Sequence, residues 1–323
     1  MNAAVLRSPG ATPRCEQFPE PTAGDGEALV HVHASALKPV DKQIAAGSHF
    51  ASPRDFPAVC GTDGVGHLED GVRVFFGGPR RPYGAMAEHT VVPRAFCFRV
   101  PEALDDATAA AVANPGVSAW LTLAHRAKVA AGDSVLIMGA TGVTGKLAVE
   151  IAKLLGAGRV IATGRNEQAL ASLRDRGADV TVQISRPDDE LREEFARAGG
   201  DTGFQVIIDY LWGHPTEVLL SALTRSEFAA SASETRLVQA GESAGATISL
   251  PAAALRSTAL TILGTAGIPS RDLLEDAFRQ VMDRAARGEI RVEVEQVPLA
   301  DIEAAWRRED RGGKRLVIVP SDH

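Results

Sequence analysis

The residues with the clearest chemical potential are the glycines of one short segment, GATGVTGK at 139–146. Glycine lets a backbone approach a phosphate group closely, and the free N–H groups at the start of a following helix attract negative charge. The segment therefore predicts a nucleotide-binding turn. Which kind of nucleotide it binds depends on the residues beside the glycines.

Two phosphate-binding patterns give different results on this segment. In the P-loop pattern G-x-x-x-x-G-K-[ST], aligned on Gly145 and Lys146, Ala140 replaces the first glycine and Leu147 replaces the magnesium-binding Ser/Thr. We therefore exclude triphosphate hydrolysis. The dinucleotide pattern G-x-G-x-x-G needs only Ala140 in place of its first glycine. Gly142 is then expected beside the pyrophosphate, and Gly145 where helix and strand pack closely.

The surrounding elements favour the dinucleotide interpretation over a glycine turn that binds nothing. An apolar run at 134–138 predicts a strand buried on both faces, and apolar residues at helical spacing follow it up to Gly156. Strand and helix candidates then alternate from 159–163 to 260–264. This alternation predicts a parallel sheet covered by helices, the doubly wound fold.

The flanking parts of the chain have a different character. The segment before residue 115 is rich in Gly, Pro and short alternating runs such as 28–37, with little helical periodicity. The end of the chain returns to short strands, with a final one in RLVIVP. We therefore expect a mostly-β domain of residues 1–118 and 268–323, into which a doubly wound domain of residues 119–267 is inserted.

The second strand of the doubly wound domain indicates the cofactor. An NAD site places Asp or Glu on the ribose about 20 residues after the glycines, but the tip 163–166 carries no acid. Arg165 can offer a charged fork to a 2′-phosphate, and Asn166 can donate beside it. We therefore predict NADPH. The turn residues and the ends of two later strands complete the predicted cofactor-binding set: Thr141, Gly142, Val143, Thr144, Gly241, Glu242, Ser243, Gly264 and Thr265.

A short-chain dehydrogenase is a further reading of the glycine segment. That family requires Tyr-x-x-x-Lys for proton transfer, but the two tyrosines, Tyr83 and Tyr210, are followed four residues on by Ala87 and His214. The glycines also lie far from the start of the chain. Both features exclude this family.

The chain resembles the zinc-independent quinone oxidoreductase branch of the medium-chain dehydrogenase/reductase superfamily over nearly its whole length. The similar segments are HRAKVAAGDSVLIMGATGVTGKLAVEIAKLLGAGRVIATG, ALKPVDKQIAAG, GTDGVGHLEDGVRVFF and RGGKRLVIV. The resemblance implies a GroES-like β domain with an inserted Rossmann domain, a cleft between them, NADPH use and a homodimer. It also implies that Ser118 touches the cofactor near the domain junction, where Asn114 lies as well.

Departures from the superfamily's patterns bear on metal and catalysis. Lys38 stands where the zinc enzymes have a cysteine ligand, and GTDGVG replaces their Gly-His-Glu, so a catalytic zinc is not expected. Hydride addition without a metal requires an electrophilic acceptor, such as a quinone or an α,β-unsaturated carbonyl, and donors for the oxygen that becomes negative. The candidates are Lys38, which is otherwise a surface lysine, Asp41, which orients Lys38 or caps a turn or helix, and His49, a proton donor or an exposed loop histidine. His31 and His33 share a strand face, but no third metal ligand is evident.

Composition narrows the remaining classes. The net charge of −7 argues against a nucleic-acid partner, and no run of about 20 apolar residues predicts a membrane span. Three widely spaced cysteines suggest reduced thiols in a cytoplasm. The sequence thus predicts a cytoplasmic NADPH-dependent reductase of a quinone or enone. An enoyl or alkenal double-bond reductase of secondary metabolism and a non-catalytic NADPH-binding protein are the alternatives.

Overall fold

The computed structural model describes residues 1–224, 234–265, 267, 269–308 and 313–320. The chain folds into two compact units, Met1–Asn114 with Phe278–His323, and Pro115–Ala277. The domain boundaries predicted from the sequence stay predictions, and one of their residues, 268, lies outside the described ranges. Each unit is described separately below.

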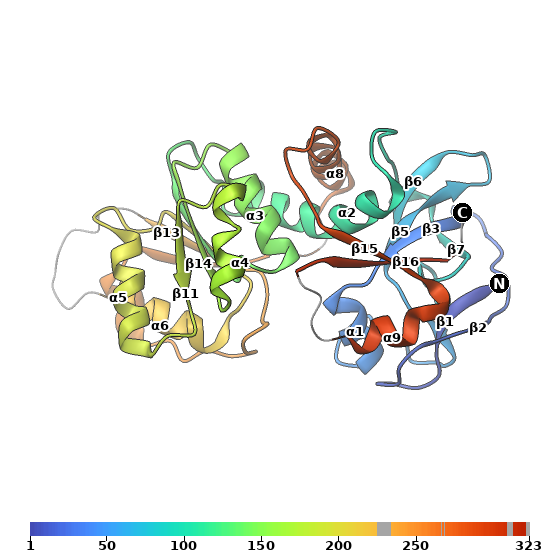
Figure 1. Cartoon of the computed structure of the whole chain (residues 1–323), viewed down its shortest axis with the longest axis horizontal. Coiled ribbons are helices and arrows are strands. Elements are labelled where there is room, and N and C mark those ends of the chain that lie inside the picture. The colour runs from blue at the N-terminus through green and yellow to red at the C-terminus, as the bar shows by residue number, and fades with distance from the viewer. Residues whose placement is uncertain (225–233, 266, 268, 309–312, 321–323) are drawn as a thin grey trace. The chain divides into compact units, whose positions relative to one another are not determined.

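Antiparallel strands make up most of the first unit. One sheet has the order β2-β1-β4, and a second has the order β15-β16-β3-β5-β6-β8, with β7 also paired to β3. Figure 1 shows β16 beside β3, although about 280 residues separate them, with Val317 paired to Ala36. The strands are β1 (Asn2–Leu6), β2 (Arg14–Gln17), β3 (Glu27–Ala36), β4 (Ala58–Val59), β5 (Asp63–Leu68), β6 (Arg73–Gly77), β7 (His89–Pro93), β8 (Cys97–Arg99), β15 (Val294–Pro298) and β16 (Arg315–Val319).

Helices in and beside this unit were only partly expected from the sequence. The helices predicted near 270–287 and 302–308 are present as α8 (Arg271–Ala286) and α9 (Ile302–Arg307). Two others, α1 (Pro39–Ala46) and α2 (Asp106–Trp120), fall in the segment where little helical periodicity was seen. Most side chains of α2 are buried, so its sequence lacks the polar stripe that reveals a surface helix.

The second unit contains a six-stranded parallel sheet of order β11-β10-β9-β12-β13-β14 (Figure 1). The chain runs from β9 outward to β11 and then returns to β12 on the other side of β9. This reversal is the switch point at which doubly wound sheets bind ligands. The strands are β9 (Ser134–Met138), β10 (Arg159–Gly164), β11 (Val180–Gln183), β12 (Val206–Asp209), β13 (Thr235–Gln239) and β14 (Leu260–Gly264).

Apolar side chains on both faces of this sheet explain its place in the interior. All five residues of β9 are buried. On one face Leu136 packs in a cluster with Phe195 and Leu219, which α5 and α6 supply. The helices of the unit are α3 (Val143–Leu154), α4 (Glu167–Ala171), α5 (Asp188–Gly199), α6 (Gly213–Leu223) and α7 (Ala252–Ser257). The predicted fold class, a GroES-like mostly-β domain with an inserted doubly wound domain, is confirmed.

Within the described residues, none of the helices combines the length and the apolar character needed to cross a membrane.

Candidate functional site

The glycine turn joins β9 to α3 at the switch point of the parallel sheet. Gly139 has a φ of 79°, which a residue with a side chain rarely adopts, and Gly142 is the N-cap of α3. Hydrogen bonds fix the turn to the end of β10: the Gly139 N–H donates to Thr163 Oγ1 (3.0 Å) and the Ala140 N–H to the Thr163 carbonyl (2.8 Å). The turn is therefore preorganised.

Gly142 and Gly145 have opposite surroundings. A Cβ placed on Gly145 would lie 2.4 Å from the Gly139 carbonyl oxygen, so the first turn of α3 packs directly against the loop. A Cβ on Gly142 would find its nearest atom at 3.7 Å, so this position is open. No side chain caps α3, and its first N–H groups need acceptors from outside the helix. A closed Gly145, an open Gly142 and an uncapped helix match what a dinucleotide pyrophosphate requires.

Arg165 and Asn166 directly follow β10, the strand beside β9. Both side chains are exposed. The side chains of Gln183 and Ser185 donate to the Arg165 carbonyl, at 3.2 and 3.4 Å, and so hold its backbone. Asn166 caps α4, because its Oδ1 accepts from the Ala169 N–H at 2.9 Å. Its amide NH₂ is still a donor, so the predicted role beside a 2′-phosphate stays a prediction.

The other predicted residues of this unit lie at the same edge of the sheet, since all its strands are parallel. Ser243 Oγ donates to the Tyr210 carbonyl (3.0 Å), and the Gly264 carbonyl accepts from Arg126 Nε (2.6 Å). The remaining members, Thr141, Val143, Thr144, Gly241, Glu242 and Thr265, lie in the loops after β9, β13 and β14 or at the start of α3. Ser118 is exposed on α2, four residues after the exposed Asn114.

At the carboxyl end of β12 the structure adds a buried acid that was not predicted. Asp209 is fully buried, and its Oδ1 accepts from the N–H groups of Leu211 (2.8 Å) and Trp212 (2.9 Å). Its Oδ2 accepts from Thr216 Oγ1 (2.6 Å). Burial raises the pKa of Asp209, although these hydrogen bonds act in the opposite direction. Asp209 thereby fixes the loop that leads into α6.

In the first unit, Lys38 is buried rather than on the surface. Its Nζ donates to Asp63 Oδ1 (2.8 Å) and to the Ala36 carbonyl (3.1 Å), and it lies 3.5 Å from Asp41 Oδ2. The three N–H bonds of the ammonium thus face three protein oxygens. This geometry does not favour the predicted role of Lys38 as a direct donor to a substrate oxygen.

Asp41 and Asp63 share this single ammonium with further polar groups. Asp41 Oδ2 also accepts from the Lys38 backbone N–H (2.8 Å), so both roles considered for Asp41, orienting Lys38 and capping a helix, are present. Thr62 Oγ1 lies within hydrogen-bond distance of both carboxyls, and Asn114 Nδ2 donates to Asp63 Oδ2 at 3.3 Å.

The charges of this cluster are coupled through burial. Burial disfavours the Lys38 ammonium, but the Asp41 and Asp63 carboxylates outweigh that effect and raise the pKa of Lys38. Burial also raises the pKa of Asp41, against the opposing influence of Lys38. The cluster therefore keeps a charged lysine and a carboxyl group with an increased affinity for a proton.

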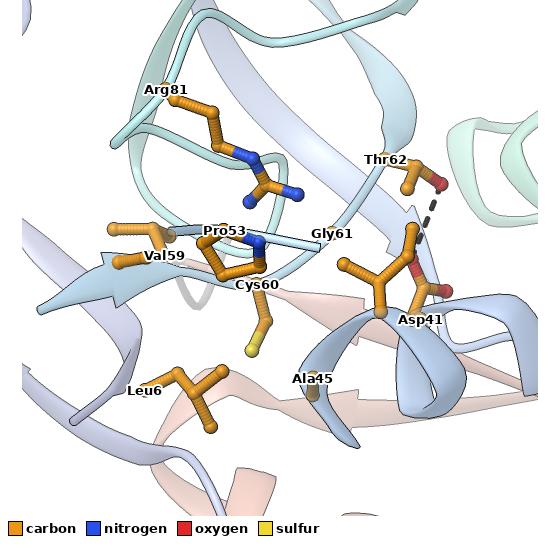
Figure 2. A pocket seen from close by; sticks show the side chains of 11 residues that line it. Leu6, Asp41, Ala45, Pro53, Val59, Cys60, Gly61, Thr62 and Arg81 are labelled. Atoms are coloured by element: carbon orange, nitrogen blue, oxygen red, sulfur yellow. Dashed lines mark hydrogen bonds between the residues drawn. The ribbon is translucent and has the colours of Figure 1, made fainter. Parts of the chain in front are cut away.

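A small cavity lies beside Asp41 (Figure 2). Cys60 and the Arg81 guanidinium line it opposite Asp41, and Thr62 Oγ1 bridges to the Asp41 carboxyl. Burial raises the pKa of the Cys60 thiol to about 12, so the thiol stays protonated at neutral pH and is a poor nucleophile. We interpret Cys60 as a packing residue.

His49, the third predicted catalytic residue, lies in the loop after α1. Its Nδ1 accepts from the Ala51 N–H at 3.1 Å, and its ring packs 4.2 Å from the ring of the exposed Phe50. Because Nδ1 is the acceptor, the neutral ring carries its proton on Nε2. The proton-donor role of His49 stays a prediction.

Comparisons with known proteins agree with this geometry. The family model described as "Zinc-binding dehydrogenase" matches residues 143–287. The quinone oxidoreductase of Pongo abelii is 31% identical over 205 residues, which cover 59% of each chain. A solved quinone oxidoreductase from Thermus thermophilus, also obtained in complex with NADPH, aligns with a TM-score of 0.81 and 29% identity over 99% of this chain and all of that one.

The chain belongs to the medium-chain dehydrogenase/reductase superfamily. Its relatives place it in the zinc-independent quinone oxidoreductase branch, as the sequence resemblance implied. A mycocerosic acid synthase-like polyketide synthase of Mycobacterium tuberculosis is also 33% identical over 220 residues, which make up 64% of this chain and 10% of that protein. The chain thus matches about three fifths of the length of the curated quinone oxidoreductase and a small part of the synthase.

Proposed function

We propose that the protein is an NADPH-dependent oxidoreductase that transfers a hydride to a quinone or an α,β-unsaturated carbonyl compound without a catalytic metal. The observation that carries this proposal is the turn at the switch point, which is closed at Gly145 and open at Gly142. A glycine turn without a ligand would have no need of both features. The NADPH complex of the Thermus thermophilus relative supports the same cofactor.

In this proposal the residues of the parallel sheet hold the cofactor. The N–H groups at the start of α3, with Val143 and Thr144, bind the pyrophosphate, and Thr141 and Gly142 leave room for it. Arg165 binds the 2′-phosphate, because its exposed guanidinium follows the strand next to β9. When bound, NADPH supplies the hydride. The loops after β13 and β14 hold the remainder of the dinucleotide.

The buried cluster of the first unit supports chemistry without a metal. Lys38 already provides the positive charge that balances Asp63, and a second cation beside this ammonium would be repelled. We assign Lys38 and Asp41 as positioning residues, since their polar atoms are engaged within the cluster. Asn114, whose amide donates to Asp63 and whose side chain is exposed, and His49 are the groups we propose near the acceptor's oxygen.

The experiment that tests this function is a substrate panel. Purified protein, stripped of metal by a chelator, is mixed with NADPH and a set of quinones, enones and enoyl thioesters, and the loss of NADPH absorbance is followed. We expect turnover with at least one quinone or enone and no loss of activity after chelation. Binding of NADPH without turnover of any compound would favour a non-catalytic protein instead.

The alternative enzyme, an enoyl or alkenal double-bond reductase, differs from the first proposal only in its acceptor. The same panel separates the two, because a double-bond reductase converts alkenals or enoyl thioesters and leaves quinones unchanged. The cytoplasmic location and the homodimer stay predictions. Gel filtration at several protein concentrations would test the dimer.

A further inference from the structure

Four histidines gather on neighbouring strands of the first unit. His31 is paired directly with His67 of β5 on one side and with His89 of β7 on the other. His33 follows two residues later on β3. The sequence showed only that His31 and His33 share a strand face, and the fold supplies the other two imidazoles. Cross-strand partners in such ladders lie about 5 Å apart, so these side chains are direct neighbours.

The shortest contact in this group joins His33 and His67. Nε2 of His33 and Nδ1 of His67 are 3.2 Å apart, and the ring centroids are 4.5 Å apart. Two imidazole nitrogens that bind one Zn²⁺ at about 2.0–2.1 Å in a tetrahedron lie roughly 3.3 Å from each other. The observed spacing is therefore that of two ligands of one metal ion. In the absence of a metal the same spacing fits a hydrogen bond between the rings.

A carboxylate fixes the orientation of His33. Nδ1 of His33 lies 2.9 Å from Asp106 Oδ2, and Arg73 Nε donates to the other oxygen of Asp106 at 2.7 Å. An ionised Asp106 accepts the Nδ1 proton, which leaves the lone pair of Nε2 directed at His67. A carboxylate that holds the second nitrogen of an imidazole is the usual support of a metal-binding histidine.

The backbone also departs from a regular ladder at this point. Val32 pairs with Gly66 and Ala34 pairs with Val65, so the register shifts and His33 is the extra residue of a β-bulge. Bulges redirect a side chain, and they are common beside functional sites. At Gly66 a Cβ would lie 2.1 Å from the His31 carbonyl oxygen, so the strands approach closely beside His67.

We propose that His33, His67 and His31 form a binding site for one divalent transition-metal ion of the zinc class. His33 supplies Nε2, His67 supplies Nδ1, and His31 supplies a third nitrogen after rotation of its ring; water completes the coordination. Within the part of the chain that the structure describes, no three such groups are already assembled around one point, so the rotation of His31 is part of the proposal. Imidazole ligands suit Zn²⁺, Ni²⁺ and Cu²⁺.

The site ties β3 to β5, so binding should stabilise the fold and need not alter hydride transfer. The test uses the full chain without an affinity tag, titrated with Zn²⁺ by calorimetry, and with Co²⁺, whose visible spectrum reports nitrogen ligands. We expect one ion per chain, a tetrahedral-type Co²⁺ spectrum and a rise in Tm with Zn²⁺. His67→Gln should abolish the Co²⁺ spectrum, and Asp106→Asn should weaken Zn²⁺ binding by about tenfold or more.

The matched control is the double variant His125→Gln with His214→Gln, which removes two histidines outside the group. It should bind Zn²⁺ as the unaltered chain does. If His67→Gln proves unstable, His31→Gln serves as the second variant, because His31 is exposed. The proposal is overturned if the unaltered chain binds no ion, or if the variants of His31 and His67 bind Zn²⁺ as tightly as it does.

Discussion

Gly145 lies against Gly139 so closely that a methyl group on Gly145 would come within 2.4 Å of the Gly139 carbonyl oxygen. Gly142, three residues earlier, has room for the same methyl group. These two glycines therefore separate the structural role of the turn from its binding role.

Alanine at each of the two glycines should have different effects. Gly145→Ala should lower the free energy of unfolding by about 1–3 kcal/mol, because the added carbon overlaps backbone atoms that cannot move freely. Gly142→Ala should unfold at nearly the same denaturant concentration as the unaltered protein, yet bind NADPH about tenfold more weakly. Urea unfolding and cofactor titration measure the two quantities. Equal NADPH affinity in Gly142→Ala and the unaltered protein would contradict the assigned binding position.

Arg165→Ala should reduce the preference for NADPH. We expect the Kd for NADPH to rise about tenfold or more, while the Kd for NADH stays constant, because only NADPH carries the 2′-phosphate. Arg186→Ala is the control, since Arg186 is an exposed arginine of the same unit that pairs with Glu190 at 3.6 Å. An equal loss of affinity for both cofactors in Arg165→Ala would argue against recognition of the 2′-phosphate.

Lys38→Met should destabilise the first unit strongly. The substitution leaves Asp63 buried without its ammonium, and loss of one partner from a buried pair costs about 3–5 kcal/mol. The double variant Lys38→Met with Asp63→Asn should recover part of that loss. Lys153→Met is the matched control, because Lys153 pairs with Asp179 at the surface, where an ion pair contributes about 0–1 kcal/mol. Similar unfolding curves for the two single variants would contradict the buried cluster.

The pH dependence of stability should report Asp209. Burial raises the pKa of this carboxyl above its value in the unfolded chain, so the folded state holds the proton more tightly. The favourable contribution is complete below the unfolded pKa of about 3.9 and is lost as pH rises through the folded pKa. Asp209→Asn removes this titration. The stability of the variant relative to the unaltered protein should therefore increase from acid to neutral pH, and a constant difference across this range would count against a raised pKa.

The parallel sheet was predictable because its signals are local. Each strand is a short apolar run, each helix has apolar residues at helical spacing, and Gly142 and Gly145 stand at the junction of β9 and α3. Helix α2 was not predicted, because its residues are buried on most sides and Pro115 lies within it. A helix of this kind lacks the contrast between faces on which sequence patterns depend.

The groups brought together from distant parts of the chain could not be predicted. Lys38 and Asp63 are 25 residues apart, and the pairing of β3 with β5 sets their contact. His33 and His67 are 34 residues apart and meet through the same ladder, at a bulge that no spacing rule reveals. The one available signal was Asp63 itself, an acid among glycines and apolar residues at the start of a strand.

The central claim is that this chain moves a hydride from NADPH to an electrophilic acceptor without a catalytic metal. The most direct measurement uses NADPH deuterated at C4 of the nicotinamide, chelator-treated protein and an enone that the substrate panel shows to be turned over, with the product analysed by mass spectrometry and NMR. We predict one deuterium on the β-carbon of the reduced enone, from one face of the cofactor only. A product without deuterium, or a reaction that stops on chelation and resumes when Zn²⁺ is restored, would contradict the account.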